Sequence, residues 1–251
     1  MNGEFGADKP LAMDDRHWRD LAPDRLRKMQ AAGAEILKCY HVLTKVNANV
    51  VGELLKTADT FFEWDHYPKG DVYDRDTHAQ YYYHAHRGVD NEHGHFHTFM
   101  RRKGIPAEIQ PLADQGSAKV PEGDDILSHL IAISMVPAGY PFILFSTNRW
   151  VTGENWFKAS DVVSMLDHFE IDHAWPSWPT NRWISAMIIL FRPQIVALLE
   201  ERDRVVAEWA EKHPDRDVYE DRSLEITSYM PVSVEEQIAR INQELSSRAA
   251  A

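Results

Sequence analysis

The sequence predicts an α+β fold, with a small antiparallel sheet built from two successive hairpins and packed with N-terminal and C-terminal helices. Three observations lead to this prediction. Apolar residues recur at three- and four-residue spacings near both ends of the chain. Short alternating or apolar segments separated by turn-forming residues occupy the middle. The resulting helix–sheet–helix order is typical of α+β proteins. With 251 residues, of which 44% are hydrophobic, we expect one domain spanning residues 1–251, with residues 1–13 mobile.

Two helices are expected before the sheet. Pro23 suits the first turn of a helix in which apolar residues from Leu26 to Leu43 recur at helical spacing. A second, shorter helix is expected over residues 48–55. Residues 61–76 are rich in aromatic and acidic side chains and are interrupted by Pro68 and Gly70, which predicts a loop.

The sheet is expected to consist of two hairpins. The segments 80–87 and 93–101 are joined by the turn-forming residues 88–91, so that residues 80–101 form one histidine-rich hairpin. The apolar segments 129–136 and 142–147 form the second hairpin, with a proline-containing turn between them. His129 alternates with Ile131 and Ile133, so it is either a core residue or the lid of the predicted pocket, and we favour the core.

The C-terminal part is predicted to be mainly helical. Ser160 can cap a helix over residues 161–169, and a second helix is expected over residues 181–191. Pro193 suits the start of a long amphipathic helix reaching Lys212. A short strand is expected over residues 224–229, and Ser233 with Glu236 forms a capping box that opens a last helix.

The charge and the motifs exclude several classes of protein. The chain carries 27 basic and 39 acidic side chains, a net charge of −12, which argues against binding to nucleic acid. A single cysteine, Cys39, excludes an intrachain disulfide and thiolate metal cages. The first 13 residues contain no secretory signal, and the longest apolar run, residues 184–191, is too short to cross a membrane. We therefore expect a soluble, cytoplasmic protein without a nucleic-acid or membrane partner.

Histidines are concentrated in the first predicted hairpin. Seven of the 13 histidines lie between His66 and His97. Residues two apart in a strand share a face. If a four-residue turn pairs Arg87 with Glu92, then His84 faces His95, His86 faces His93, and Tyr82 faces His97, whereas an odd-length turn would separate the two sets. On the first reading five imidazoles share one face of the hairpin: His84, His86, His93, His95 and His97.

This pattern predicts a metal site. Neutral imidazole is the commonest protein ligand of metal ions. Imidazoles held together repel one another when protonated and lack partners when buried, and a metal ion relieves both problems. We expect these five histidines to hold one or two divalent transition-metal ions, with zinc, iron, copper and nickel all compatible. Gly94 indicates a bulge or a close approach by another element, and a bulge would disturb the facing of the flanking histidines.

Three further residues are candidates for substrate binding. Tyr82 borders the predicted histidine face, and Arg149 and Arg182, each flanked by Asn and Trp, can bind an anion. A metal ion with an open coordination position would activate water or dioxygen for a small-molecule substrate, as in a hydrolase or an oxygenase. The alternatives are a metal buffer, chaperone or sensor without catalysis, and a metal-free interaction domain that responds to pH. No nucleotide-binding glycine motif and no helical His-Glu-x-x-His motif is present.

Three stretches of the sequence resemble an uncharacterised bacterial protein family. These stretches are residues 81–86, 92–99 and 147–154. The resemblance covers most of the chain and implies no activity or ligand, because none is assigned to that family.

Overall fold

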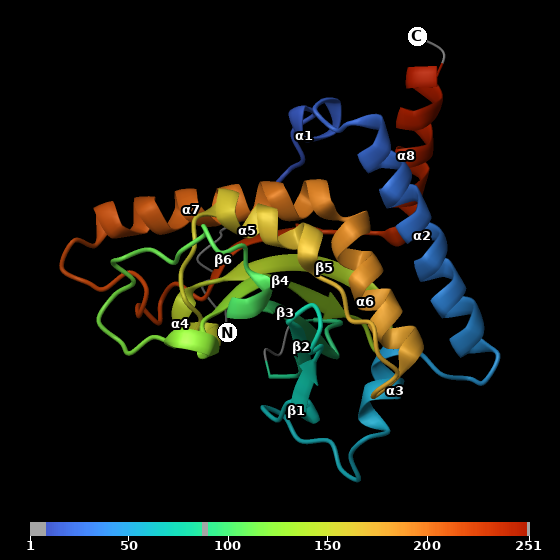
Figure 1. Ribbon diagram of the computed structural model, residues 1–251, viewed down its shortest axis with the longest axis horizontal. Helices are drawn as coiled ribbons and strands as arrows, with labels where there is room; N and C mark the ends of the chain where they lie inside the picture. Colours follow the sequence, from blue (N-terminus) through green and yellow to red (C-terminus); the bar gives the residue numbers. More distant parts are fainter. Residues whose placement is uncertain (1–8, 87–89, 250–251) are drawn as a thin grey trace.

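The computed structural model describes residues 9–86 and 90–249, and its centre is one antiparallel sheet of six strands (Figure 1). Each strand pairs with the next along the chain, so the order in the sheet is the order in the sequence. The two predicted hairpins are its four central strands. The strands are β1 (Tyr67–Tyr73), β2 (Ala79–His84), β3 (Gly94–Arg101), β4 (Leu127–Met135), β5 (Pro141–Thr147) and β6 (Ile226–Pro231).

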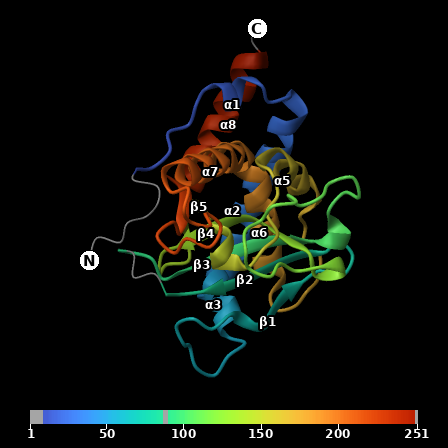
Figure 2. The same cartoon turned by 90° about the vertical axis from the view of Figure 1, so that its left-hand side faces the viewer.

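Helices cover one face of this sheet. In Figures 1 and 2, α5, α6 and α7 lie on the same side of the strands, and α2 and α8 pack beside them. The helices of the described residues are α1 (Arg16–Arg19), α2 (Pro23–Thr44), α3 (Val50–Leu55), α4 (Arg149–Thr152), α5 (Ala159–Met165), α6 (Trp178–Leu190), α7 (Arg192–Lys212) and α8 (Val234–Ala249). The predicted α+β class, with helices at both ends of the chain, is confirmed.

The sheet is larger than predicted because β1 lies within the segment expected to be a loop. Its residues Tyr67 and Val72 are buried, but the register with β2 shifts between them. Gly70 and Asp71 have φ angles of 86° and 59° there, which is the conformation of an irregular strand rather than an alternating one. The bulge therefore conceals the strand pattern in the sequence. At the other edge, β6 extends the sheet by pairing with β5.

The two capping predictions have opposite outcomes. At the start of α8, the backbone N–H of Glu236 donates to Oγ of Ser233 over 3.2 Å, as the capping box predicts. At α5 the prediction was wrong, because the helix begins at Ala159, before Ser160. There the backbone N–H of Ala159 donates to the Asp203 carboxylate of α7 over 2.7 Å, so a distant side chain performs the capping.

The two faces of the sheet differ in chemistry. On the face toward the helices, Phe96 packs against Trp183 of α6 at 5.4 Å between ring centroids, and the Tyr81 hydroxyl donates to Asn181 over 2.6 Å. Residues of β2 and β3 that alternate with these, such as Tyr82 and His97, point to the opposite face. His84, His95 and His97 are thus separated from the helical layer by the sheet itself.

Parts of two expectations lie outside the described residues. These are residues 1–8 of the N-terminal segment expected to be mobile and residues 87–89 of the hairpin and its turn. Of the remaining N-terminal residues, Leu11 donates its N–H to the Tyr229 carbonyl over 2.8 Å, and Leu11 and Met13 pack against the core. Within the described residues no single helix is long and apolar enough to cross a membrane. The helices α6 and α7, which meet at a bend of 69°, reach that length and apolarity only when they are counted together.

Gly94 is the glycine on which the hairpin depends. A Cβ atom added there would lie 2.5 Å from the His84 carbonyl oxygen and 2.6 Å from the Tyr83 hydroxyl. We expect Gly94→Ala to lower the free energy of unfolding by about 1–3 kcal/mol because the backbone of β2 must move away. Urea denaturation measures this change.

Gly52→Ala is the matched control. Gly52 lies within α3, and its added Cβ would meet no atom closer than 3.5 Å. Alanine in a helix interior is favoured over glycine by about 1 kcal/mol, so this variant should be as stable as the wild type or more so. Equal stability of Gly94→Ala and Gly52→Ala would contradict the close approach.

Candidate metal centre

Three histidines of the hairpin converge on the face of the sheet away from the helices. His84 of β2 pairs directly with His95 of β3, and Tyr82 pairs with His97, which is the register predicted from a four-residue turn. One ring nitrogen from each of His84, His95 and His97 lies within 4.8 Å of the others. A tetrahedral zinc ion with nitrogen ligands at about 2.0–2.1 Å requires separations of roughly 3.4 Å, so small ring rotations would allow these three histidines to hold a metal ion.

The three imidazoles are buried. Their exposed fractions are 8% for His84 and 1% each for His95 and His97. Nε2 of His84 makes no hydrogen bond to any residue that the structure describes. Burial, followed by the neighbouring His95, His86 and His66, lowers the pKa of His84 to about 2. The ring is therefore neutral and has a free lone pair at ordinary pH, which is the state that binds a metal ion.

A carboxylate orients His95. Nδ1 of His95 donates to Oε1 of Glu92 over 2.7 Å, and the Ser134 hydroxyl of β4 donates to Oε2 of the same carboxylate over 2.8 Å. The Glu92 side chain is 3% exposed. A hydrogen bond at Nδ1 leaves Nε2 of His95 as the nitrogen that can bind a metal ion. The sequence placed Glu92 near the site but did not show that it contacts His95.

His129 of β4 contacts His97, the third histidine of the cluster. Nδ1 of His97 lies 3.0 Å from Nε2 of His129. The alternation in the sequence predicted that His129 lies on the same face as Ile131 and Ile133. The β3–β4 register, however, shifts between Thr98 and Phe99. This bulge turns His129 to the histidine face, while both isoleucines remain on the core face. Burial lowers the pKa of His129 to about 3, with the nearby Arg202 contributing.

A buried carboxyl group lies beyond His129. Oε2 of Glu154 accepts the backbone N–H of His129 over 2.6 Å, and Oε1 accepts the Thr152 hydroxyl over 3.2 Å. Burial raises the pKa of Glu154 to about 7. The hydrogen bond from the His129 N–H to Glu154 holds in place the backbone from which the His129 ring projects.

The other predicted members of the site lie at its edge. The Tyr82 ring is 5.1 Å from the His84 ring and 5.2 Å from the His97 ring, so it borders the cluster. His86 is half-buried, with its ring 4.6 Å from that of His84 and 5.2 Å from that of His95. The three-histidine group thus has Tyr82 on one side and His86 on another.

His93 does not join the cluster. Its Nδ1 lies 2.7 Å from the hydroxyl of Tyr83, a residue of the opposite face, and its ring packs against Phe61. Strand β3 begins only at Gly94, so strict alternation does not extend back to His93. Because His93 lies before the strand, the expectation that all five histidines share one face is not met.

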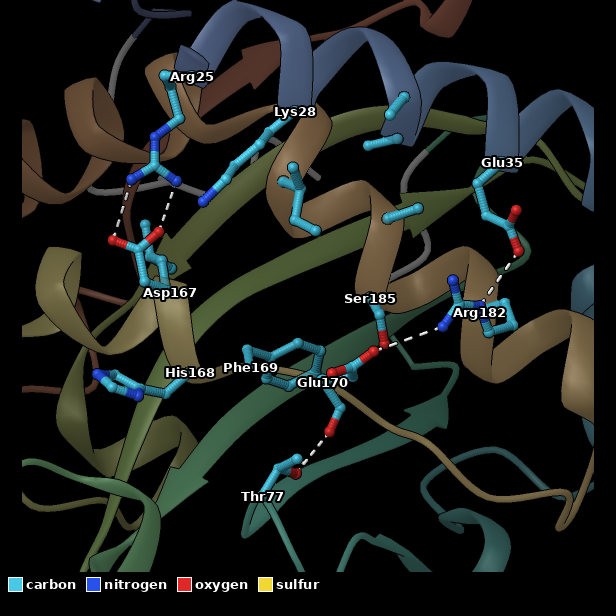
Figure 3. Close-up of a pocket in the computed structure, with 15 residues that line it drawn as sticks. Arg25, Lys28, Glu35, Thr77, Asp167, His168, Phe169, Glu170, Arg182 and Ser185 are labelled. Atoms are coloured by element: carbon cyan, nitrogen blue, oxygen red, sulfur yellow. Dashed lines mark hydrogen bonds and ion pairs between the residues drawn. The ribbon is translucent and has the colours of Figure 1, made fainter. Parts of the chain in front are cut away.

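The two arginines lie elsewhere. Arg149 of α4 is buried, with its guanidinium paired to Glu220 and 3.4 Å from the Glu154 carbonyl. Arg182 of α6 donates to Glu35 over 3.1 Å and to Glu170 over 3.4 Å. It lines a cavity of about 480 Å³ between α2 and α6, in the helical layer, where a second ion pair joins Arg25 to Asp167 (Figure 3). The sheet therefore separates Arg182 from the histidine cluster.

Comparison with known proteins adds a family but no activity. A family model described as a domain of unknown function, DUF6969, matches residues 30–232. This range includes the whole sheet and every histidine of the cluster. No curated protein and no solved structure matches the chain.

The low pKa of His84 predicts a pH dependence of stability in the metal-free protein. An unfolded chain protonates this residue below about pH 6.5, whereas the folded chain keeps it neutral down to about pH 2. The stability that neutral His84 contributes is fully present above pH 6.5 and is lost as the pH falls toward the folded pKa. The free energy of unfolding of His84→Asn, relative to that of the wild type, should therefore rise by about 2 kcal/mol as the pH falls from 6.5 to 5.

Urea denaturation in the presence of a chelator measures the free energy of unfolding of the wild type and of His84→Asn as a function of pH. His41→Asn is the control, because its side chain is exposed on α2 and its profile should run parallel to that of the wild type. Parallel profiles for the wild type and His84→Asn would contradict the burial of a neutral imidazole.

Proposed function

The chain belongs to the DUF6969 family, a domain of unknown function, and we propose that it is a metal-dependent enzyme whose one divalent metal ion is held by His84, His95 and His97. The reaction class that we propose is hydrolysis or hydration by a metal-activated water molecule. The observation that carries the proposal is the convergence of three buried imidazole nitrogens within 4.8 Å.

The donor set favours zinc among the four candidate metals. Three histidine ligands and an open fourth position are the pattern of catalytic zinc sites, in which a bound water has its pKa lowered to about 7. Non-haem iron oxygenases instead use two histidines and one carboxylate. The nearest carboxylate here, that of Glu92, accepts hydrogen bonds from His95 and Ser134, so it serves to orient a ligand. This difference supports hydrolytic chemistry over dioxygen chemistry.

Two residues preset the histidines for this role. With Nδ1 bonded to Glu92, His95 presents Nε2 to the ion. If His97 donates its Nδ1–H to Nε2 of His129, it likewise presents Nε2. Hydrogen bonds of this kind fix the tautomer and the ring plane before the metal binds, which reduces the entropy lost on binding.

Burial also supports an enzyme over a metal buffer. A buffer requires ligands that exchange metal freely, as in an exposed ladder of histidines. Here all three ligands are buried, His95 and His97 almost completely, and a carboxylate that is not a ligand lies beside them. A water-poor site strengthens electrostatic interactions with a substrate.

Metal content tests the proposal directly. After stripping with a chelator and reloading with zinc, the wild type should retain about one equivalent per chain, since the three ligands form one site. The double variant His84→Ala/His95→Ala should retain almost none. Elemental analysis of protein purified without an affinity tag is the measurement.

The control double variant is His41→Ala/His168→Ala. Both side chains are exposed, one on α2 and one at the end of the 3₁₀ turn Leu166–His168. It should bind as much zinc as the wild type. Stoichiometric zinc in His84→Ala/His95→Ala, or its absence from the wild type, would refute the proposed centre.

The contact between Glu92 and His95 predicts a smaller effect. Glu92→Gln keeps the shape of the side chain but removes the charge that fixes the His95 tautomer, so zinc affinity should fall about 10–100-fold. Competition with a chromophoric chelator measures the affinity. Asp90→Asn, an exposed position nearby in the chain, should leave it unchanged, and equal affinities for both variants would show that Glu92 does not orient a ligand.

A further inference from the structure

Exposed aromatic side chains gather in the loop that joins α3 to β1. Phe61, Phe62 and Trp64 are all exposed, and 69% of Trp64 is accessible to solvent. In Figures 1 and 2 this loop extends from the β1 end of the molecule, away from α7 and α8. Large apolar side chains grouped on a surface are typical of a binding site.

Trp64 is held in place at this surface. Its backbone N–H donates to the Ala85 carbonyl over 3.0 Å, and its indole stacks on the His86 ring with centroids 4.4 Å apart and an angle of 19° between the planes. Its φ angle is +76°, a left-handed conformation that is unfavourable for a bulky residue. A tryptophan with one face on a histidine and most of its surface in water does not stabilise the core.

The same loop borders the histidine cluster. The His86 ring on which Trp64 stacks lies 4.6 Å from the His84 ring, so two ring contacts connect Trp64 with a candidate metal ligand. His66, two residues after Trp64, stacks on Tyr82 at 3.6 Å and lies 5.5 Å from His84. The exposed indole therefore stands beside the part of the cluster that is nearest to solvent.

We propose that Trp64 is a substrate-binding residue of this metal centre and that its exposed indole face binds a planar ring of the substrate, several bonds from the group that reacts. This inference rests on the proposed function. An indole face favours offset stacking with aromatic or heteroaromatic rings. The neighbouring carboxylates of Glu63 and Asp65 are exposed, which favours a neutral or positively charged ring over an anionic one.

Two hydroxamates, one with an aromatic ring and one without, test the inference. Hydroxamate groups bind zinc, so acetohydroxamate reports on the metal centre alone, whereas 4-phenylbutanohydroxamate adds a ring on a flexible chain. For the zinc-loaded full chain, calorimetry should show tighter binding of the phenyl compound. Trp64→Ala should reduce that preference about three- to tenfold and leave acetohydroxamate binding unchanged.

Two further variants complete the experiment. Trp64→Phe should retain part of the preference, and Trp175→Ala, which removes an exposed tryptophan from the loop before α6, should retain all of it. An unchanged preference in Trp64→Ala, with zinc and acetohydroxamate still bound, overturns the role of Trp64 but leaves the metal centre intact. Failure of the zinc-loaded wild type to bind either hydroxamate overturns the proposed function and this inference together.

Discussion

The register between β2 and β3 is the constraint on which the candidate centre depends. Side chains alternate along a strand, so a shift of one residue would move His84 to the face opposite His95 and His97. Contacts at both ends of the pair hold the observed register. At one end Nε of Arg101 donates to Oε1 of Gln80 over 2.6 Å, and at the other Gly94 allows the His84 carbonyl to approach closely. Between them, Tyr81 and Phe96 anchor the pair to α6.

The electrostatics of the cluster follow from this geometry. Burial keeps His84 and His129 neutral, and the only carboxylate in hydrogen-bond contact with one of the three ligands, among the described residues, is that of Glu92. Three imidazole nitrogen donors beside one carboxylate form an environment suited to a divalent cation. Without a cation, the polar nitrogen of His84 has no hydrogen-bond partner among the described residues, which is an unfavourable state for a buried group.

The sequence was sufficient to predict the parts of this arrangement that follow strict alternation. The pairing of His84 with His95 and of Tyr82 with His97 depends only on a period of two and on the length of one turn. It was not sufficient where a bulge intervenes, because a bulge reverses the facing of every residue before it. The favoured core position of His129 was wrong for this reason, and the bulge in β1 concealed a whole strand. His93 was misplaced for a different reason, because it precedes Gly94, the first residue of β3. The contact between Glu92 and His95, and the ion pairs of Arg149 and Arg182, depend on residues far apart in sequence or on turn geometry.

The coordination of the bound ion is the most direct test of this account. X-ray absorption at the metal edge of the zinc-loaded full chain reports the number and type of atoms bound to zinc. We predict one zinc site with three imidazole nitrogens at about 2.0–2.1 Å and at least one further light atom from solvent. A spectrum without the scattering pattern of bound imidazole, or with imidazole scattering that persists unchanged in His84→Ala/His95→Ala, would contradict it.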